Sequence, residues 1–242
     1  MKAMILAAGL GTRLKPLTDK IPKALIKVNG ITMLEHVIIR LKKFGINEII
    51  INVFHLAEQI EAFLKTKNNF DIRIELSFED TLLDTGGGLK KASWFFDKES
   101  SFLLHNVDVI SDLNITEMQK IHNNNDSMIS IAIRSRKTSR YFLFDKNNRL
   151  CGWKNENTGE QKIVKESSQD LLPFSFMGIH VISPNVFKYF PEENKLSIVD
   201  LYLDNASENK ILGFQADKYS WIDCGKQENL AKAEYIIYHK EH

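Results

Sequence analysis

A glycine-rich segment follows the first apolar run of the chain and has the composition of a phosphate-binding loop. Glycines let the backbone come close to a ligand, and consecutive backbone N–H groups can bind phosphate oxygens. A guanidinium contacts phosphate through two parallel hydrogen bonds, and an ammonium acts as a compact positive charge. We expect nucleotide contacts from the residues Leu6, Ala7, Ala8, Gly9, Gly11, Thr12, Arg13 and Lys23.

Two well-known phosphate loops do not fit this segment. A P-loop needs the pattern GxxxxGK followed by Ser or Thr, which is absent here. A dinucleotide-binding fingerprint needs a third glycine where this chain has Leu14. The pair Gly9 and Gly11 alone is as typical of an ordinary turn as of a ligand site.

Two aspartates, Asp108 and Asp223, follow apolar runs. Asp108 ends the run that begins at Phe102, and Asp223 follows Trp221 and Ile222. A carboxylate at the end of a buried strand lies at the edge of a parallel sheet, where α/β proteins bind ligands. Mg²⁺ takes one or two carboxylates together with phosphate oxygens and waters. The pair therefore predicts a Mg²⁺ site, although a strand-end or helix N-cap aspartate has the same local pattern.

The hydrophobic pattern predicts the elements that must position these residues. Short apolar runs alternate with stretches of helical periodicity, which is typical of a mixed, mostly parallel sheet flanked by helices. The expected strands are Met4–Ala7, Glu48–Val53, Ile72–Phe78, Phe102–Val107, Met128–Arg134 and Phe176–Ile182, with a hairpin of Phe142–Phe144 and Leu150–Trp153. The expected helices are Met33–Phe44, Ala57–Lys67, Gly86–Phe96, Ser197–Asn205 and Gln227–Tyr238. Residues 155–173 are polar and are expected to form a loop.

Length and composition restrict the class of protein. The 242 residues are 43% hydrophobic and 26% charged, which is globular composition, and we expect one α/β domain over residues 1–242. A net charge of +1 argues against a nucleic-acid partner. Two cysteines cannot form a disulfide framework. No apolar stretch reaches the ~18 residues that a membrane span requires. We therefore expect a cytoplasmic protein, as a monomer or small homo-oligomer.

The full sequence of the glycine-rich loop indicates a protein family far more specifically than its glycines alone do. LAAGLGTRLKPLT with a following Pro-Lys resembles the signature of the sugar-1-phosphate nucleotidylyltransferase family. The resemblance covers essentially the whole chain and is greatest to N-acetylmuramate-1-phosphate uridylyltransferases and short mannose-1-phosphate guanylyltransferase-like proteins. It continues through Asp84–Gly88, Asn106–Val109 and Trp221–Gly225. It implies a single-domain, Rossmann-like nucleotidyltransferase fold.

The resemblance also implies roles for individual residues. Arg13, Lys23 and Asp108 would be catalytic, and Asp108 and Asp223 would bind Mg²⁺. Glu79 lies where relatives contact the nucleotide base, and a carboxylate can accept a base N–H. Backbone N–H groups around the triple glycine would face the base or the sugar. This adds Glu79 and Gly86 to the nucleotide site and assigns the sugar to Thr85, Gly87, Asn106 and Gly178.

Two departures from the family pattern stand out. Val107 replaces the glycine that most relatives carry before the metal aspartate. Its bulk would lie beside the metal site unless it points into the core, since neighbouring strand residues face opposite sides. Many relatives also carry a phosphate-contacting lysine in a Glu-Lys-Pro motif, which this chain lacks; Lys154 and Lys165 are possible substitutes.

The implied reaction transfers a nucleotidyl group from an NTP to a sugar 1-phosphate and releases pyrophosphate. We expect UTP as the donor, because Asp84–Gly88 matches the uridylyltransferase pattern. The alternatives are a guanylyltransferase acting on mannose 1-phosphate or a related sugar phosphate, and a cytidylyltransferase acting on a small phosphate such as phosphocholine. A non-enzymatic alternative is a nucleotide-binding regulatory subunit.

Overall fold

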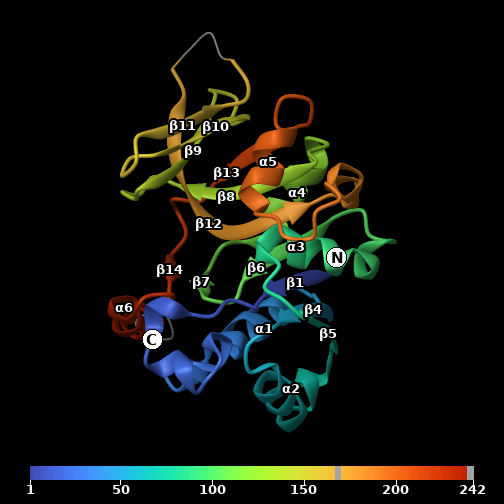
Figure 1. The fold of residues 1–242 in the computed structure, drawn as a ribbon, viewed down its shortest axis with the longest axis vertical. Helices are drawn as coiled ribbons and strands as arrows, with labels where there is room; N and C mark the ends of the chain where they lie inside the picture. Colours follow the sequence, from blue (N-terminus) through green and yellow to red (C-terminus); the bar gives the residue numbers. More distant parts are fainter. Residues whose placement is uncertain (167–169, 239–242) are drawn as a thin grey trace.

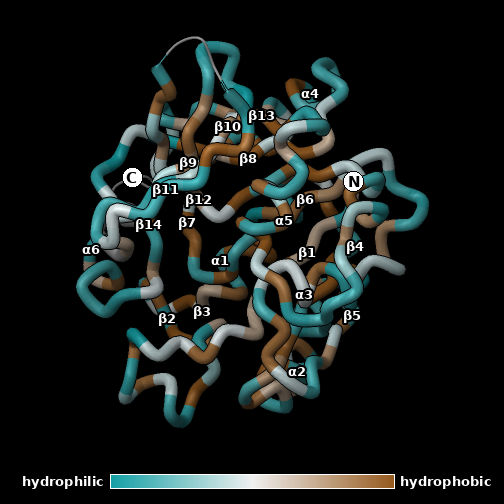
Figure 2. The backbone as a smooth tube through the Cα atoms, turned by 45° about the horizontal axis from the view of Figure 1, so that its top comes forward, coloured by the Kyte–Doolittle hydropathy of each residue, from teal (hydrophilic) through white to brown (hydrophobic). Residues whose placement is uncertain are grey.

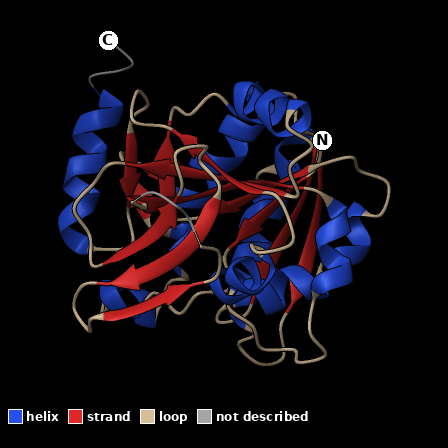
Figure 3. Cartoon of the chain, turned by 90° about the horizontal axis from the view of Figure 1, so that it is seen from above, coloured by secondary structure: helices blue, strands red, loops and turns tan. Residues whose placement is uncertain are grey.

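The apolar runs of the sequence form a mixed sheet, which is ten-stranded over the residues described by this computed structural model, 1–166 and 170–238. Side chains are described up to residue 233. The strand order is β11-β10-β9-β12-β6-β1-β4-β5, with β8 beside β12 and β13 beside β8. Helices flank the strands, as Figures 1 and 3 show. The expected α/β class and mixed sheet are therefore confirmed.

The sheet has a parallel half and a largely antiparallel half. The parallel half consists of β1 (Ala3–Leu6), β4 (Glu48–Val53), β5 (Arg73–Phe78) and β6 (Phe102–Asn106). The other half consists of β8 (Ile129–Arg134), β9 (Arg140–Phe144), β10 (Leu150–Asn155), β11 (Glu160–Ile163), β12 (Leu172–Ile182) and β13 (Ile211–Gln215), where only β8 and β13 pair in parallel.

The helices are α1 (Met33–Lys43), α2 (Ala57–Thr66), α3 (Asp84–Lys91), α4 (Ile115–Asn124), α5 (Ile198–Asn205) and α6 (Gln227–Tyr238). Two small ribbons pair β2 (Lys27–Val28) with β3 (Ile31–Thr32) and β7 (Val109–Ser111) with β14 (Trp221–Asp223). No helix among the described residues has the length and apolar content needed to cross a bilayer.

Burial on both faces explains the isoleucine-rich centre of the sheet. Ile49 and Ile51 of β4 pack in one apolar layer, and Ile50 between them packs in the other. Successive strand residues point to opposite faces, so a strand covered on both sides is apolar throughout. The helix α1 buries Leu34 and Leu41 against the first layer. Figure 2 shows hydrophobic segments running through the strands and hydrophilic segments at the outer loops.

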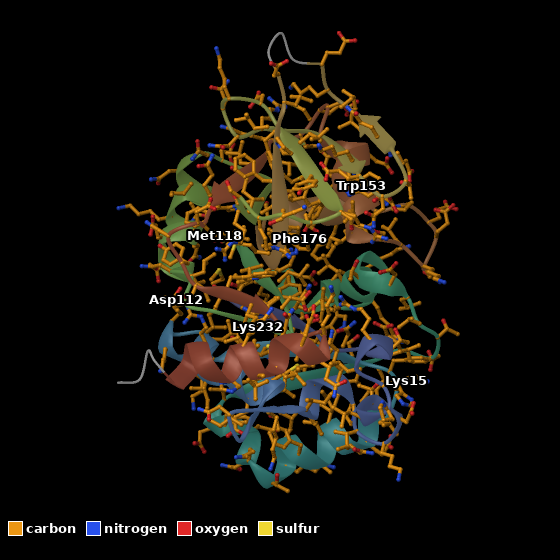
Figure 4. All side chains as sticks on the ribbon, turned by 90° about the vertical axis from the view of Figure 1, so that its left-hand side faces the viewer. Lys15, Asp112, Met118, Trp153, Phe176 and Lys232 are labelled. Atoms are coloured by element: carbon orange, nitrogen blue, oxygen red, sulfur yellow. The ribbon has the colours of Figure 1, made fainter. Side chains whose placement is uncertain are left out.

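A third, smaller apolar cluster ties the C-terminal part of the chain to the N-terminal loop. Leu14 and Met33 pack there against Ile222, Cys224 and Ala233. Figure 4 shows α6, marked by Lys232, lying across the blue N-terminal segment, in agreement with the contacts between α6 and β2. This packing brings the segment after β14 to the loop that follows β1.

Several elements differ from the sequence-based expectation. The strands β7, β13 and β14 and the helix α4 were not predicted, and α3 begins at Asp84 and ends at Lys91 instead of covering Gly86–Phe96. The loop expected at 155–173 was wrong in part, because β11 lies within it and β12 begins at Leu172; positions 167–169 lie outside the described residues. All four residues of β11 are exposed, so no apolar alternation marked this edge strand.

Candidate active site

The candidate site lies at one edge of the parallel half of the sheet. Leu6, the last residue of β1, pairs with Asn106 at the end of β6 and with Asn52 near the end of β4. Because these strands are parallel, their carboxyl ends meet at the same edge. The glycine loop after β1 and Asp108 after β6 are therefore neighbours.

The glycine loop turns back on itself directly after β1. Gly11 has a φ of 63°, a left-handed conformation that glycine adopts without strain. Its carbonyl accepts a hydrogen bond of 2.9 Å from the Thr18 hydroxyl. A Cβ at Gly11 would lie 2.7 Å from the Thr18 methyl group and 3.1 Å from the Lys23 Cβ. Gly11 thus allows the loop to fold closely enough to bring Lys23 to the site.

A cavity of about 430 Å³ opens above this edge of the sheet. We call it the glycine-loop pocket. It contains most of the residues expected at the nucleotide and also Thr85, Asn106 and Asp108 of the predicted sugar and metal sites. Its lining comprises Leu6, Ala7, Ala8, Gly9, Lys23, Asn52, Glu79, Leu82, Asp84, Thr85, Asn106, Val107, Asp108 and Lys195.

Asn52 organises the floor of this pocket. Its Oδ1 accepts a hydrogen bond of 2.8 Å from the Ala7 N–H, and its Nδ2 donates one of 2.7 Å to Glu79 Oε1. The other carboxylate oxygen of Glu79 accepts from the Leu83 N–H at 3.0 Å. Glu79 is therefore buried and partly satisfied within the protein, and only its remaining lone pairs can meet a base. Sequence reasoning missed Asn52, because nothing distinguishes a polar residue in an apolar strand before its partners are known.

Asp108, Asp223 and Arg13 converge on one point beside Gly225. A Cβ placed on Gly225 would lie 2.7 Å from Asp223 Oδ1, 2.8 Å from Asp108 Oδ2 and 2.8 Å from Arg13 Nη2. The pairing of β7 with β14 holds this arrangement, and the Cys224 N–H donates to the Asp108 carbonyl at 2.7 Å. The two aspartates are far apart in sequence, and the structure brings them together as predicted.

Lys23 completes this group of charges. Its ammonium forms an ion pair with Asp108, and each of these two side chains is only 13% exposed. Arg13 itself is exposed at the mouth of the loop. The Gly225 N–H donates to Asp223 Oδ1 at 2.7 Å, which fixes the orientation of that carboxylate.

The donor set fits a hard divalent cation that also binds substrate. Mg²⁺ prefers oxygen ligands, and one or two carboxylates suffice when phosphates and waters supply the rest. Asp108 and Asp223 provide two convergent carboxylates of this kind. Among the described residues no group of three His, Cys, Asp or Glu side chains could enclose a metal ion. The arrangement therefore suits a metal shared with phosphate rather than one enclosed by protein.

The triple glycine plays a different part from the one expected. The N–H groups of Gly86 and Gly87 both donate to the Leu196 carbonyl, at 2.8 and 3.1 Å, so they are engaged within the protein. Added Cβ atoms would lie 2.9 Å from the Leu196 carbonyl oxygen at Gly86 and 2.1 Å from the Asn194 carbonyl oxygen at Gly87. At Gly88 the Cβ would lie 2.8 Å from Glu79 Oε1. These glycines let α3 pack closely and are not directed at a ligand.

Of the remaining expected sugar residues, Gly178 lies against Asn106 but does not itself line the glycine-loop pocket. Gly178 of β12 has a φ of 77°, and a Cβ there would lie 2.8 Å from the Asn106 amide nitrogen. Asn106 and Thr85 both line the glycine-loop pocket. The Thr85 hydroxyl also accepts a hydrogen bond of 3.0 Å from the Ile198 N–H.

The two lysines suggested as substitutes lie elsewhere. Lys154 forms an ion pair of 3.0 Å with Glu156, and neither it nor Lys165 lines the glycine-loop pocket. Lys195, in the segment docked on α3, does line the pocket and was missed, because a lysine in a polar turn carries no distinguishing signal. Val107 is buried and packs in the core, and it also lines the glycine-loop pocket beside Asp108. Burial raises the pKa of Cys224 to about 12, which agrees with a packing role.

Comparison with known proteins agrees with this arrangement. The nucleotidyl transferase family matches residues 2–240. Relatives include a D-glycero-alpha-D-manno-heptose 1-phosphate guanylyltransferase of Campylobacter jejuni, 29% identical over 95% of this chain and 96% of its own length. An N-acetylmuramate alpha-1-phosphate uridylyltransferase of Caulobacter vibrioides is 26% identical over 96% of this chain and 95% of its own. A UTP–glucose-1-phosphate uridylyltransferase of Synechocystis is 28% identical, and the chain spans 60% of its length.

Solved structures show the same fold. HddC from Yersinia pseudotuberculosis in complex with GMP-PN has a TM-score of 0.78 and 22% identity, covering 98% of this chain and 99% of that one. A Bacillus anthracis structure described as a glucose-1-phosphate thymidylyltransferase has a TM-score of 0.79 and 20% identity, covering 98% and 94%. The fold, the glycine loop with its convergent aspartates, and the match across almost the whole sequence lead to one conclusion: the chain belongs to the nucleotidyl transferase family.

Proposed function

We propose that this protein transfers a nucleotidyl group from an NTP to a sugar 1-phosphate, giving an NDP-sugar and pyrophosphate. The observation that carries the proposal is the convergence of Asp108, Asp223 and Arg13 on one point beside the glycine-loop pocket. The named activities of the Campylobacter and Caulobacter relatives, which match over almost their full length, support it.

The protein's own residues act by positioning and charge neutralisation. A phosphate oxygen of the sugar 1-phosphate attacks the α-phosphorus of the NTP, a P–O bond forms to it, and the bond to the pyrophosphate oxygen breaks. The glycine loop and Arg13 hold the leaving pyrophosphate, and Lys23 offsets charge near the α-phosphate. No covalent enzyme intermediate is needed, so orientation and electrostatic stabilisation supply most of the catalysis.

Mg²⁺ is the cofactor that the donor set suits best. Asp108 and Asp223 would hold it, with phosphate oxygens and waters as further ligands. When bound, the metal stabilises negative charge on the reacting phosphates. Lys23 pairs with Asp108, so its ammonium also offsets the charge of that carboxylate.

UTP is the nucleotide that we propose. Glu79 presents carboxylate oxygens to the pocket, and uracil N3–H can donate to a remaining lone pair. Cytosine has no N3–H, so it would place a lone pair against the carboxylate, which is costly in a buried site. Guanine also offers N–H donors, and the guanylyltransferase relative makes GTP the second candidate.

One experiment tests both the reaction and the base. The protein is incubated with Mg²⁺, each of the four NTPs and a series of sugar 1-phosphates, and pyrophosphate release is followed. We expect the highest kcat/KM with UTP. A tenfold higher value with GTP refutes the uridylyl choice and leaves nucleotidyl transfer intact. Turnover with phosphocholine and CTP alone identifies the cytidylyltransferase alternative, and nucleotide binding without turnover identifies a regulatory subunit.

Four further properties are part of the proposal. We expect residues 1–242 to act as one nucleotidyltransferase domain, in the cytoplasm, as a monomer or small homo-oligomer. The partners would be the two small substrates, with neither nucleic acid nor a membrane involved. Gel filtration with light scattering measures the oligomeric state directly.

A further inference from the structure

A second cavity, of about 290 Å³, shares Asp223 with the group of charges beside Gly225. We call it the arginine pocket. Two guanidinium groups and one ammonium line it, against a single carboxylate. Its lining comprises Arg134, Ser135, Arg136, Trp221, Ile222, Asp223, Lys226 and Asn229. This positively charged cavity therefore adjoins the candidate catalytic centre.

The two arginines share one aromatic surface. The Cζ atoms of Arg134 and Arg136 lie 5.8 and 4.7 Å from the centre of the Trp221 ring. Cation–π contacts of this kind orient the planar guanidinium groups. Among the described side chains, those of residues 1–166 and 170–233, neither guanidinium forms a salt bridge with a carboxylate, and Arg134 Nε is buried without a hydrogen-bond partner.

The single carboxylate of Asp223 leaves this group of cations with an excess of positive charge. Two like charges held on one indole repel each other, and a buried N–H donor without an acceptor is unfavourable. Burial lowers the pKa of Arg136, and the nearby Asp223 carboxylate acts in the opposite direction. A bound group with several negative oxygens would relieve both the repulsion and the unsatisfied donor.

The position of Trp221 indicates which anion the arginine pocket binds. Its Nε1 donates a hydrogen bond of 2.7 Å to the Met177 carbonyl, directly before Gly178. Gly178 lies against Asn106, and Asn106 is an expected sugar residue that lines the glycine-loop pocket. Trp221 therefore connects the arginine pocket, through Met177 and Gly178, to an expected sugar residue. The triphosphate already has the glycine loop, Arg13 and Lys23.

We propose that Arg134 and Arg136, held over Trp221, bind the phosphate group of the sugar 1-phosphate. The inference rests on the proposed function and deepens it by naming a subsite for the second substrate. A phosphomonoester offers oxygens that accept two parallel bonds from a guanidinium. The arginines would hold this phosphate beside Asp223 and reduce its repulsion from the triphosphate.

The test compares the Michaelis constants of the two substrates. Arg134→Met and Arg136→Met remove the charge and keep most of the apolar stem. For each variant we expect the KM for the sugar 1-phosphate to rise at least about tenfold, in line with a lost charge-assisted hydrogen bond. The KM for the NTP should stay within about twofold. Arg136→Lys keeps the charge but loses the planar fork, so an intermediate KM is expected.

Two further variants serve as controls for the two Michaelis constants. Arg140→Met changes an exposed arginine on β9 that lines neither pocket, and it should leave both Michaelis constants unchanged. Lys154→Gln should also leave them unchanged, because that lysine lies outside both pockets. A tenfold rise for Lys154→Gln with no change for the arginine variants overturns the proposal. An equal rise in the KM for the NTP overturns it as well. So does a rise in the KM for the sugar 1-phosphate that occurs only with sugars that carry a carboxylate.

A binding measurement separates this proposal from the proposed function. Tryptophan fluorescence is followed while α-glucose 1-phosphate, inorganic phosphate or neutral glucose is added without any NTP. α-Glucose 1-phosphate and inorganic phosphate should change the fluorescence of the parent protein. The double variant that combines Arg134→Met and Arg136→Met should show no such change. If no NTP and sugar phosphate pair is turned over, the proposed function fails, and a phosphate response that depends on the arginines still supports the subsite. A response that persists in the double variant refutes the subsite.

Discussion

Replacing Asn52 by alanine tests whether the floor of the pocket is built as described. The substitution removes the acceptor of the Ala7 N–H and the amide that donates to Glu79 at 2.7 Å. Leaving a buried amide without a partner costs about 1–3 kcal/mol, and a hydrogen bond to a charged group contributes about 1.5–3 kcal/mol. Because Asn52 lines the pocket, water reaches part of the vacated space and offsets some of this loss.

We therefore expect Asn52→Ala to lower the free energy of unfolding by about 3 kcal/mol. For a chain of this size that corresponds to a fall in Tm of roughly 6–12 °C. Urea unfolding followed by circular dichroism measures the difference, with the m-value as a check that unfolding stays two-state. The KM for the NTP should rise as well, because Ala7 and Glu79 both line the pocket.

A matched asparagine supplies the control. Asn123 is exposed on α4, so Asn123→Ala should change the free energy of unfolding by less than about 0.5 kcal/mol. If Asn52→Ala behaves like Asn123→Ala in both stability and KM, then Asn52 does not organise the floor and the reasoning is refuted.

Three other perturbations have clear expected outcomes. Asp108→Asn should lose most turnover while the protein stays folded, since a neutral amide is nearly isosteric but is a poor Mg²⁺ ligand; turnover within threefold of the parent at saturating Mg²⁺ removes Asp108 from the site. The added Cβ of Gly9→Ala has no atom within 4 Å, so this variant should keep the parent's Tm and raise the KM for the NTP. The added Cβ of Gly88→Ala would lie 2.8 Å from Glu79 Oε1, so this variant should have a lower Tm. A lower Tm for Gly9→Ala with an unchanged Tm for Gly88→Ala contradicts the assigned roles. Burial lowers the pKa of His122 from 6.5 to about 4, so the folded protein keeps it neutral while the unfolded chain takes up a proton. The stability that it contributes is complete above pH ~6.5 and is lost as the pH falls toward 4, at up to about 1.4 kcal/mol per pH unit for this one group. His122→Gln should flatten that slope in urea unfolding between pH 7 and 5, and an unchanged slope means that His122 does not titrate in this way.

Short sequence patterns predicted the structure correctly at positions where a single physical reason explains the residue type. The apolar run of β4 could be predicted because strands covered on both faces need apolar residues throughout. Gly11 could be assigned to a loop because few other residues adopt a positive φ without strain. The convergence of Asp108 with Asp223 was also expected, and it depends on a small ribbon that gave no sequence signal of its own.

Other features depend on partners that are distant in the sequence. Gly86 and Gly87 have the composition of a ligand loop, yet their N–H groups bond to Leu196, more than a hundred residues later. Arg134 ends an ordinary strand and Arg136 lies two residues beyond it, and only the position of Trp221 makes the two a candidate site. A sequence pattern cannot distinguish close packing from ligand approach until the opposing segment is placed.

The proposed function requires that both substrates bind at one site and that a nucleotidyl group passes from one to the other. Phosphorus NMR of the parent protein with Mg²⁺, UTP and a sugar 1-phosphate that supports turnover measures this directly. We expect pyrophosphate and NDP-sugar in equal amounts, and neither product when the sugar phosphate is left out. Release of pyrophosphate or inorganic phosphate without the sugar phosphate, or loss of UTP with no NDP-sugar formed, would contradict it.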